Sequence, residues 1–196
     1  MLRRVTLSLL LALSLVAGSV TVALASWPAT QDPVCSWPYT YNTNLNVTWR
    51  YGMSMTDRYR TAWSNAAAAW QATATPLYMP YQSGSAMVDT YAYFDTDDGR
   101  MGYTWLNFGA CIPYVTPLRD AWAYINTYYA ATFTTTELQQ LAGHELGHAV
   151  GLPHIQNSFT EYAIMRVSII RGNEYWAPRS WDVKLVNCVY PNWRGC

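Results

Sequence analysis

The chain has 196 residues, with 12 lysines and arginines against 12 aspartates and glutamates, so it lacks the clustered cations with which nucleic-acid-binding proteins neutralise phosphates. Hydrophobic residues make up 51% of the sequence and aromatic residues 15%, which excludes an intrinsically disordered chain. We therefore expect one globular domain with a sizeable core and no nucleic-acid partner.

The first 25 residues have the pattern of a secretory signal peptide. A basic pair, Arg3 and Arg4, precedes an apolar run at 7–22, and Ala23-Leu24-Ala25 fits the small-x-small rule of signal peptidase. A retained membrane anchor is the alternative. Cleavage after Ala25 predicts that residues 26–196 are a secreted domain, which we expect to be monomeric and, with no second apolar run long enough to span a bilayer, not membrane-bound.

Four cysteines follow the predicted signal peptide: Cys35, Cys111, Cys188 and Cys196. An even number of cysteines in an exported chain predicts two disulfide bonds, and none of these residues has the C-x-x-C spacing of a zinc site. Three pairings are open, and the sequence does not choose between them.

The first part of the domain predicts a strand followed by a helix. Residues 26–43, rich in Pro, Thr and Ser, predict an extended lead-in, and residues 45–51 alternate apolar and polar side chains, as a half-buried strand does. Ser54 with Asp57 resembles the N-terminal cap of a helix that Pro76 ends. Its apolar positions recur every three or four residues, at Met55, Tyr59, Ala62, Ala66 and Trp70.

Short strands are expected next, at 77–81, 87–94, 101–108 and 122–129. Asp95, Asp97 and Asp98 surround Gly99 in the turn between the second and third of these strands. Their carboxylates are candidate ligands for Ca²⁺, although the loop does not complete an EF-hand because Leu106 occupies its last ligand position. A solvated turn is the favoured alternative.

A second helix begins with a capping box, in which Thr134 is the cap and Glu137 follows three residues later. This helix leads into residues 144–154, which read His-Glu-Leu-Gly-His-Ala-Val-Gly-Leu-Pro-His. The four-residue spacing places His144 and His148 on one helix face, so both imidazoles can reach one metal ion.

The end of the motif explains how a third ligand arrives. Gly151 predicts a positive-φ turn that ends the helix, and Pro153 prevents the helix from resuming, so His154 can return to the metal. Three protein ligands leave a fourth position for water, which is the arrangement of a catalytic zinc site. Glu145 is rotated by about 100° from the preceding histidine, where a base for the reacting water belongs.

The chain has three histidines and all lie in this motif, which disfavours the alternative that they are merely packed or exposed. The pattern His144-Glu145-x-x-His148-x-x-Gly151-x-x-His154 resembles the zinc signature of the metzincin metalloproteases. Met165, in Ala163-Ile164-Met165, is similar to their methionine turn and would form an apolar floor under the histidines. An ordinary core methionine is the alternative.

The resemblance is closest to matrixin-like members. Residues 122–126 are similar to the strand before their active-site helix, and residues 180–190 are similar to their C-terminal helix. The resemblance implies an α+β, zincin-like fold over 26–196, with a twisted mixed sheet, two long helices and a small C-terminal subdomain that carries a C-terminal helix.

The resemblance also implies a function: a zinc-dependent endopeptidase with one catalytic Zn²⁺, a protein or peptide substrate, and Glu145 as general base. It implies an extended substrate antiparallel to an edge strand at 101–108, and a specificity-pocket wall at 166–176. Tyr162 and Tyr175 are candidates for substrate contacts, with aromatic packing as the alternative. Asp182 matches a residue that can pair with the mature N-terminus.

The sequence departs from matrixins in three respects. We expect no propeptide between Ala25 and the strand at 45, and there is no Pro-Arg-Cys-Gly segment. No histidines remain for their second, structural zinc. Cys35 as an inhibitory thiolate on the zinc is an alternative to its place in a disulfide.

Two other functions share these residues. One is a catalytically silent zinc-bearing binding module, although the glutamate and all three histidines are intact. The other is a narrow-specificity toxin protease, which differs only in its target.

Overall fold

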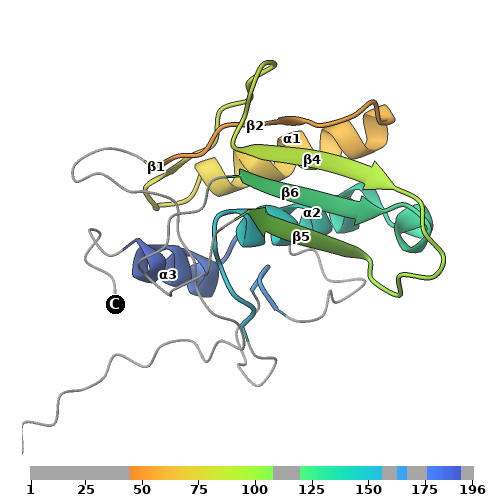
Figure 1. Ribbon diagram of the computed structural model, residues 1–196. Helices are drawn as coiled ribbons and strands as arrows, with labels where there is room; N and C mark the ends of the chain where they lie inside the picture. Colours follow the sequence, from red (N-terminus) through yellow and green to blue (C-terminus); the bar gives the residue numbers. More distant parts are fainter. Residues whose placement is uncertain (1–44, 108–119, 156–162, 167–175, 191–196) are drawn as a thin grey trace, which may run out of the picture.

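A computed structural model describes residues 45–107, 120–155, 163–166 and 176–190. The predicted signal peptide and lead-in, together with Cys35, Cys111 and Cys196, lie outside the described residues. The described part has a mixed sheet and three α-helices, which confirms the predicted α+β class (Figure 1).

The strands are β1 (Leu45–Asn46), β2 (Trp49–Tyr51), β3 (Leu77–Tyr78), β4 (Val88–Tyr93), β5 (Gly102–Asn107) and β6 (Asp120–Asn126). The helices are α1 (Asp57–Gln71), α2 (Thr135–Ala149) and α3 (Ser180–Val189), with a 3₁₀ turn, η1, at Tyr129–Thr132. No helix in these ranges is long and apolar enough to cross a membrane.

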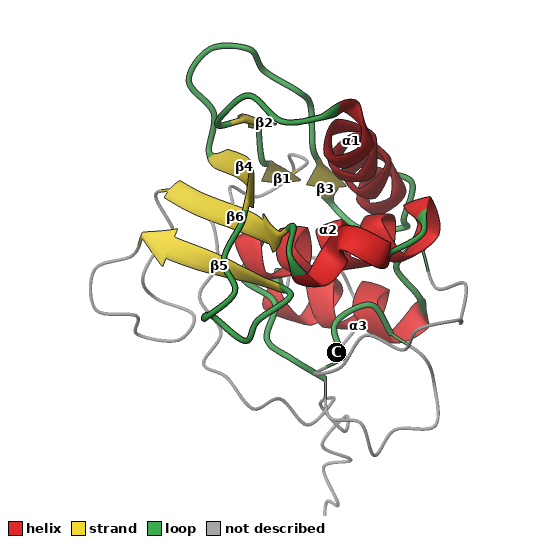
Figure 2. Ribbon diagram, turned by 90° about the vertical axis from the view of Figure 1, so that its right-hand side faces the viewer, coloured by secondary structure: helices red, strands yellow, loops and turns green. Residues whose placement is uncertain are grey.

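The main sheet has the order β2-β4-β6-β5, in which β5 is an edge strand and runs antiparallel to β6. The pairs β2–β4 and β4–β6 are parallel. Helices α1 and α2 lie on the same side of this sheet, and α3 lies beyond α2 (Figure 2). Because β5 contacts α2 directly, one edge of the sheet lies next to the helix that carries the metal motif.

The predicted strand at 45–51 is two short strands instead of one. The alternation is correct, since Leu45, Val47 and Trp49 are all buried. However, β1 pairs with β3 and β2 pairs with β4, so the extended chain changes partner between them. Alternation of apolar and polar residues predicts which side chains face the core, but it does not predict which strand will be the hydrogen-bonding partner.

The cap predicted for α1 is wrong. Thr56, not Ser54, is the N-cap, because its carbonyl accepts from the amides of Tyr59 and Arg60 and the helix begins at Asp57. Met55 consequently precedes the helix, although it still packs against the core.

The end predicted for α1 is also wrong, since the helix ends at Gln71, before Pro76. The Trp70 carbonyl accepts from both the amide and the hydroxyl of Thr73. These bonds replace the next helical turn.

The last predicted strand, 122–129, ends earlier than expected, at Asn126. The buried Asn126 side chain accepts from the amides of Asp95 and Tyr128 and donates to the Asp95 carbonyl at 2.8 Å. These bonds turn the chain out of the sheet and into η1, which starts at Tyr129.

The capping box predicted for α2 is confirmed. The Thr134 hydroxyl accepts from the Glu137 amide at 3.2 Å, and the Glu137 carboxylate accepts from the Thr134 amide at 2.7 Å. We expect Thr134→Ala to lower the free energy of unfolding by about 1 kcal/mol in urea denaturation. The adjacent exposed Thr135→Ala is the control, and an equal loss in both variants would contradict the role of the cap.

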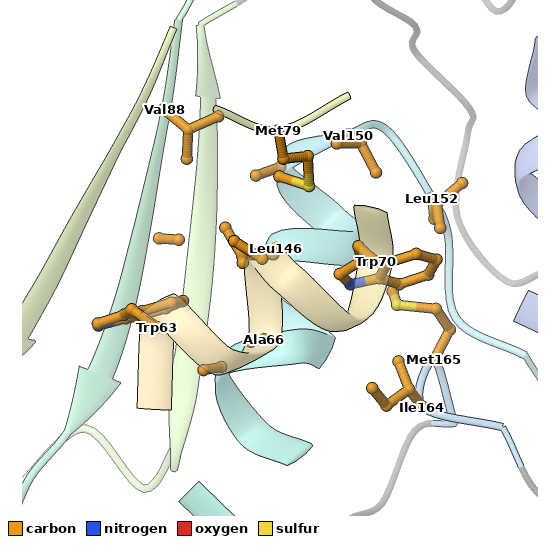
Figure 3. Close-up of a cluster of buried hydrophobic side chains, with 14 of the residues drawn as sticks. Trp63, Ala66, Trp70, Met79, Val88, Leu146, Val150, Leu152, Ile164 and Met165 are labelled. Carbon is orange, nitrogen blue, oxygen red and sulfur yellow. The ribbon is translucent and has the colours of Figure 1, made fainter. Parts of the chain in front are cut away.

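The core lies between the sheet and the two long helices, which pack against each other (Figure 3). On α1, Trp63 and Trp70 are fully buried, and the Trp70 indole N–H donates to the Gly143 carbonyl of α2 at 2.8 Å. This hydrogen bond fixes α1 against the middle of α2, at the residue just before the metal motif begins.

Candidate metal centre

The three histidines of the motif converge. The Nε2 atom of His144 lies 3.1 Å from that of His148 and 3.2 Å from that of His154, and the last two atoms are 3.0 Å apart. His144 and His148 come from one face of α2, and His154 comes from the segment after it. These residues are therefore placed to bind a single metal ion.

The turn that returns His154 has the bonds of a Schellman motif. Gly151 has a φ of 83°, and its amide donates to the His148 carbonyl at 2.8 Å. The Leu152 amide donates to the Gly147 carbonyl at 3.0 Å. This pair of bonds ends a helix through a left-handed residue, as predicted for Gly151.

Backbone carbonyls orient two of the imidazoles. Nδ1 of His144 lies 2.7 Å from the Ile164 carbonyl oxygen, and Nδ1 of His148 lies 2.8 Å from that of Leu152. A carbonyl oxygen only accepts, so in each ring Nδ1 carries the proton and Nε2 presents a lone pair. Burial, as the largest cause, lowers the pKa of His144 well below its usual value and that of His148 to about 4, which keeps both rings neutral.

This donor set fits a metal ion. Ligand nitrogens at zinc–nitrogen distances in a tetrahedral site are about 3.3 Å apart, close to the 3.0–3.2 Å separations of the Nε2 atoms. Two neutral rings with lone pairs aimed at a common point favour a cation there.

Glu145, which follows His144 in α2, is buried and contacts the edge strand. Its carboxylate oxygen Oε2 accepts from the Thr104 hydroxyl of β5 at 2.8 Å. Burial raises the pKa of Glu145 to about 8, while the Thr104 hydrogen bond and the charge of Arg100 act in the opposite direction. A carboxyl group with such a proton affinity can take a proton and return it near neutral pH.

Met165 is fully buried and packs against α2 at Gly147, while its place as a methionine turn stays a prediction. Its carbonyl accepts from the Ile155 amide at 2.7 Å, which ties the Met165 segment to the residue after the last histidine. Figure 3 shows its side chain beside the Trp70 indole, and its sulfur occupies the space that a side chain at Gly147 would need. The absence of a side chain at Gly147 therefore lets Met165 pack directly against α2.

We expect Gly147→Ala to destabilise the protein, although alanine is the better helix former. The helix-propensity gain of about 1 kcal/mol is smaller than the overpacking cost of about 1–3 kcal/mol. Gly143→Ala is the matched control, because its Cβ would meet only the mobile end of Ile164, at 2.7 Å. Urea unfolding should rank Gly147→Ala as the less stable variant, and the reverse order would contradict this packing.

Asp182 has a structural role that the sequence did not reveal. Its fully buried carboxylate accepts from the amides of Ile164 at 2.9 Å, Met165 at 3.0 Å and Arg179 at 2.7 Å. Burial raises its pKa to about 6 against the effect of these three donors. Asp182 thus connects α3 to the Met165 segment. The N-terminus that the predicted cleavage would create lies outside the described residues, so its pairing with Asp182 stays a prediction.

The three candidate calcium ligands do not form a metal-binding cluster among the described residues. Asp95 Oδ1 accepts from the amides of Asp97 and Asp98, and the Asp98 carboxylate pairs with Arg100. These bonds are those of a polar turn between strands, and a calcium ion stays a prediction.

Other predicted residues lie mostly outside the described ranges. These are Tyr162, Tyr175 and most of the segment 166–176. Cys188 is buried on α3, and the two disulfides stay a prediction.

Comparison with known proteins adds no family assignment. No protein-family model matches the chain, and no curated protein matches it at a significant level.

Proposed function

We propose that this chain is a secreted zinc-dependent endopeptidase of the metzincin type, with a matrixin-like, zincin-like domain over 26–196. The observation that carries the proposal is the convergence of three histidine Nε2 atoms within 3.0–3.2 Å, two of them from the helix that also carries the buried Glu145. Three nitrogen ligands and a neighbouring acid suit a hydrolytic zinc site with an open position.

The chemistry divides between the ion and the chain. When bound, zinc supplies Lewis acidity towards water and towards the oxygen of a peptide carbonyl. Glu145 takes a proton from the attacking water and gives it to the leaving amine. The carbonyl partners of His144 and His148 hold these rings in the tautomer that presents Nε2 to the ion.

The edge strand β5 is the proposed binding strand for an extended substrate. Among the described residues, no strand pairs with its outer side, while its inner neighbour β6 is antiparallel to it. A peptide added at this edge would gain main-chain hydrogen bonds and pass near Glu145, which Thr104 of the same strand contacts.

The test is cleavage of a peptide library by the purified, oxidised mature chain, with new termini identified by mass spectrometry. We expect internal cleavages that stop when a chelator removes the metal and resume when zinc is restored. Circular dichroism checks that the metal-free chain is folded. Cleavage that survives complete metal removal, or no cleavage with one zinc ion bound, would contradict the proposal.

A further inference from the structure

Residues on the face of β5 that packs against α2 surround the Glu145 side chain. Alternate residues of the strand point to opposite sides of the sheet, so Gly102 and Thr104 share one face and Tyr103 the other. The Tyr103 ring stacks on Tyr124 with centroids 4.4 Å apart. On the other face, Thr104 is hydrogen-bonded to the Glu145 side chain, and a Cβ added at Gly102 would meet the same carboxylate.

The two carboxylate oxygens meet different features of this strand. Oε2 accepts from the Thr104 hydroxyl at 2.8 Å. Oε1 occupies the space beside Gly102, where an added Cβ would lie 2.7 Å from Oε1 and 2.7 Å from the Tyr124 carbonyl oxygen. No larger residue fits at 102 without moving the carboxylate or the strand, so glycine at this position leaves room for the carboxylate.

The Thr104 hydroxyl has a second acceptor in the same residue. It lies 2.9 Å from the backbone carbonyl oxygen of Glu145 and 2.8 Å from Oε2. A hydroxyl has one proton to donate and also accepts. This hydroxyl lies within hydrogen-bond distance of both the backbone carbonyl and the carboxylate of Glu145, and it links the two.

We propose that Thr104 is a positioning residue whose hydroxyl holds the Glu145 carboxyl group in one place beside β5. The proposal rests on the proposed function, in which Glu145 gains and then loses one proton in each turnover. Thr104 acts only through its hydrogen bond to Oε2 and takes no part in bond making or breaking.

The test compares two substitutions at one position in the zinc-loaded mature chain. Thr104→Val keeps the shape and removes the hydroxyl, and we expect kcat to fall about 10-fold to 100-fold with little change in KM. Thr104→Ser restores the hydroxyl, and its kcat should lie within about threefold of the wild type. Thr90→Val is the matched control, because it removes a buried strand hydroxyl that donates to the Arg50 carbonyl, and its kcat should not change.

Three results would overturn the proposal: an unchanged kcat in Thr104→Val, an equal loss in Thr104→Ser, or an equal loss in Thr90→Val. If thermal melting shows that Thr104→Val does not fold, Thr104→Ala replaces it in the comparison with serine.

Crystal structures of the variants give a readout independent of turnover. We expect Oε2 within hydrogen-bond distance of residue 104 in the serine variant and displaced in the valine variant, and an undisplaced Glu145 would also overturn the proposal. If the wild type keeps this hydrogen bond but cleaves no peptide, the proposed endopeptidase function is contradicted. The proposed role of Thr104 in catalysis then fails with it.

Discussion

Replacing Glu145 with glutamine is expected to lower kcat/KM for peptide cleavage by about 10²–10⁴-fold while the bound zinc stays at the wild-type level. Glutamine has nearly the same shape, and its amide oxygen can still accept from the Thr104 hydroxyl. It cannot take the proton of the attacking water. The measurement is initial-rate cleavage of a fluorogenic peptide, with metal content determined on the same samples.

The matched control is Glu137→Gln, since Glu137 is the other buried glutamate of α2. Glutamine at this third helical position preserves the capping box, so stability and activity should both remain close to wild type. A Glu145→Gln variant that cleaves at the wild-type rate would show that another group carries the proton.

Replacing His148 with alanine is expected to weaken zinc binding by more than about 100-fold. Even the loss of a group that only hydrogen-bonds to a metal ligand lowers metal affinity by about 10–100-fold, and His148 is itself a proposed ligand. Two nitrogen ligands remain on different segments, and activity at ordinary zinc concentrations should be lost. The measurement is zinc affinity by competition with a chromophoric chelator, with cleavage followed in parallel.

His154→Ala provides an independent check, because His154 lies beyond the helix and its loss does not alter α2. Both variants should have the circular dichroism spectrum of the metal-free wild type. A variant of either histidine that retains one tightly bound zinc ion would contradict the three-histidine centre.

The features that the sequence predicted well are those with local causes. The capping box of Thr134 and Glu137 and the positive φ of Gly151 depend on residues a few positions apart, and both are found in the structure. The four-residue spacing of His144 and His148 fixes their common face through helix geometry alone. The convergence of His154 followed from the turn that Gly151 makes.

The cap and the end of α1 were misplaced although their causes are local, but the other features that the sequence missed depend on contacts between distant segments. The Thr104–Glu145 hydrogen bond joins residues 41 positions apart, and the Asp182 bonds to the Met165 segment span 17 and 18 positions. The pattern of apolar residues in β5 and α3 does not indicate these hydrogen-bond partners. The chain at 45–51 changes strand partner for the same reason, since pairing depends on residues far along the sequence.

The most direct measurement is a zinc titration of the metal-free mature chain, with peptide cleavage recorded after each addition. We expect that cleavage is absent at the start, rises with added zinc and levels off at one ion per chain. We also expect that Glu145→Gln binds the same single ion without cleaving. Cleavage before any zinc is added, or one bound ion without cleavage in the wild type, would contradict the proposed function.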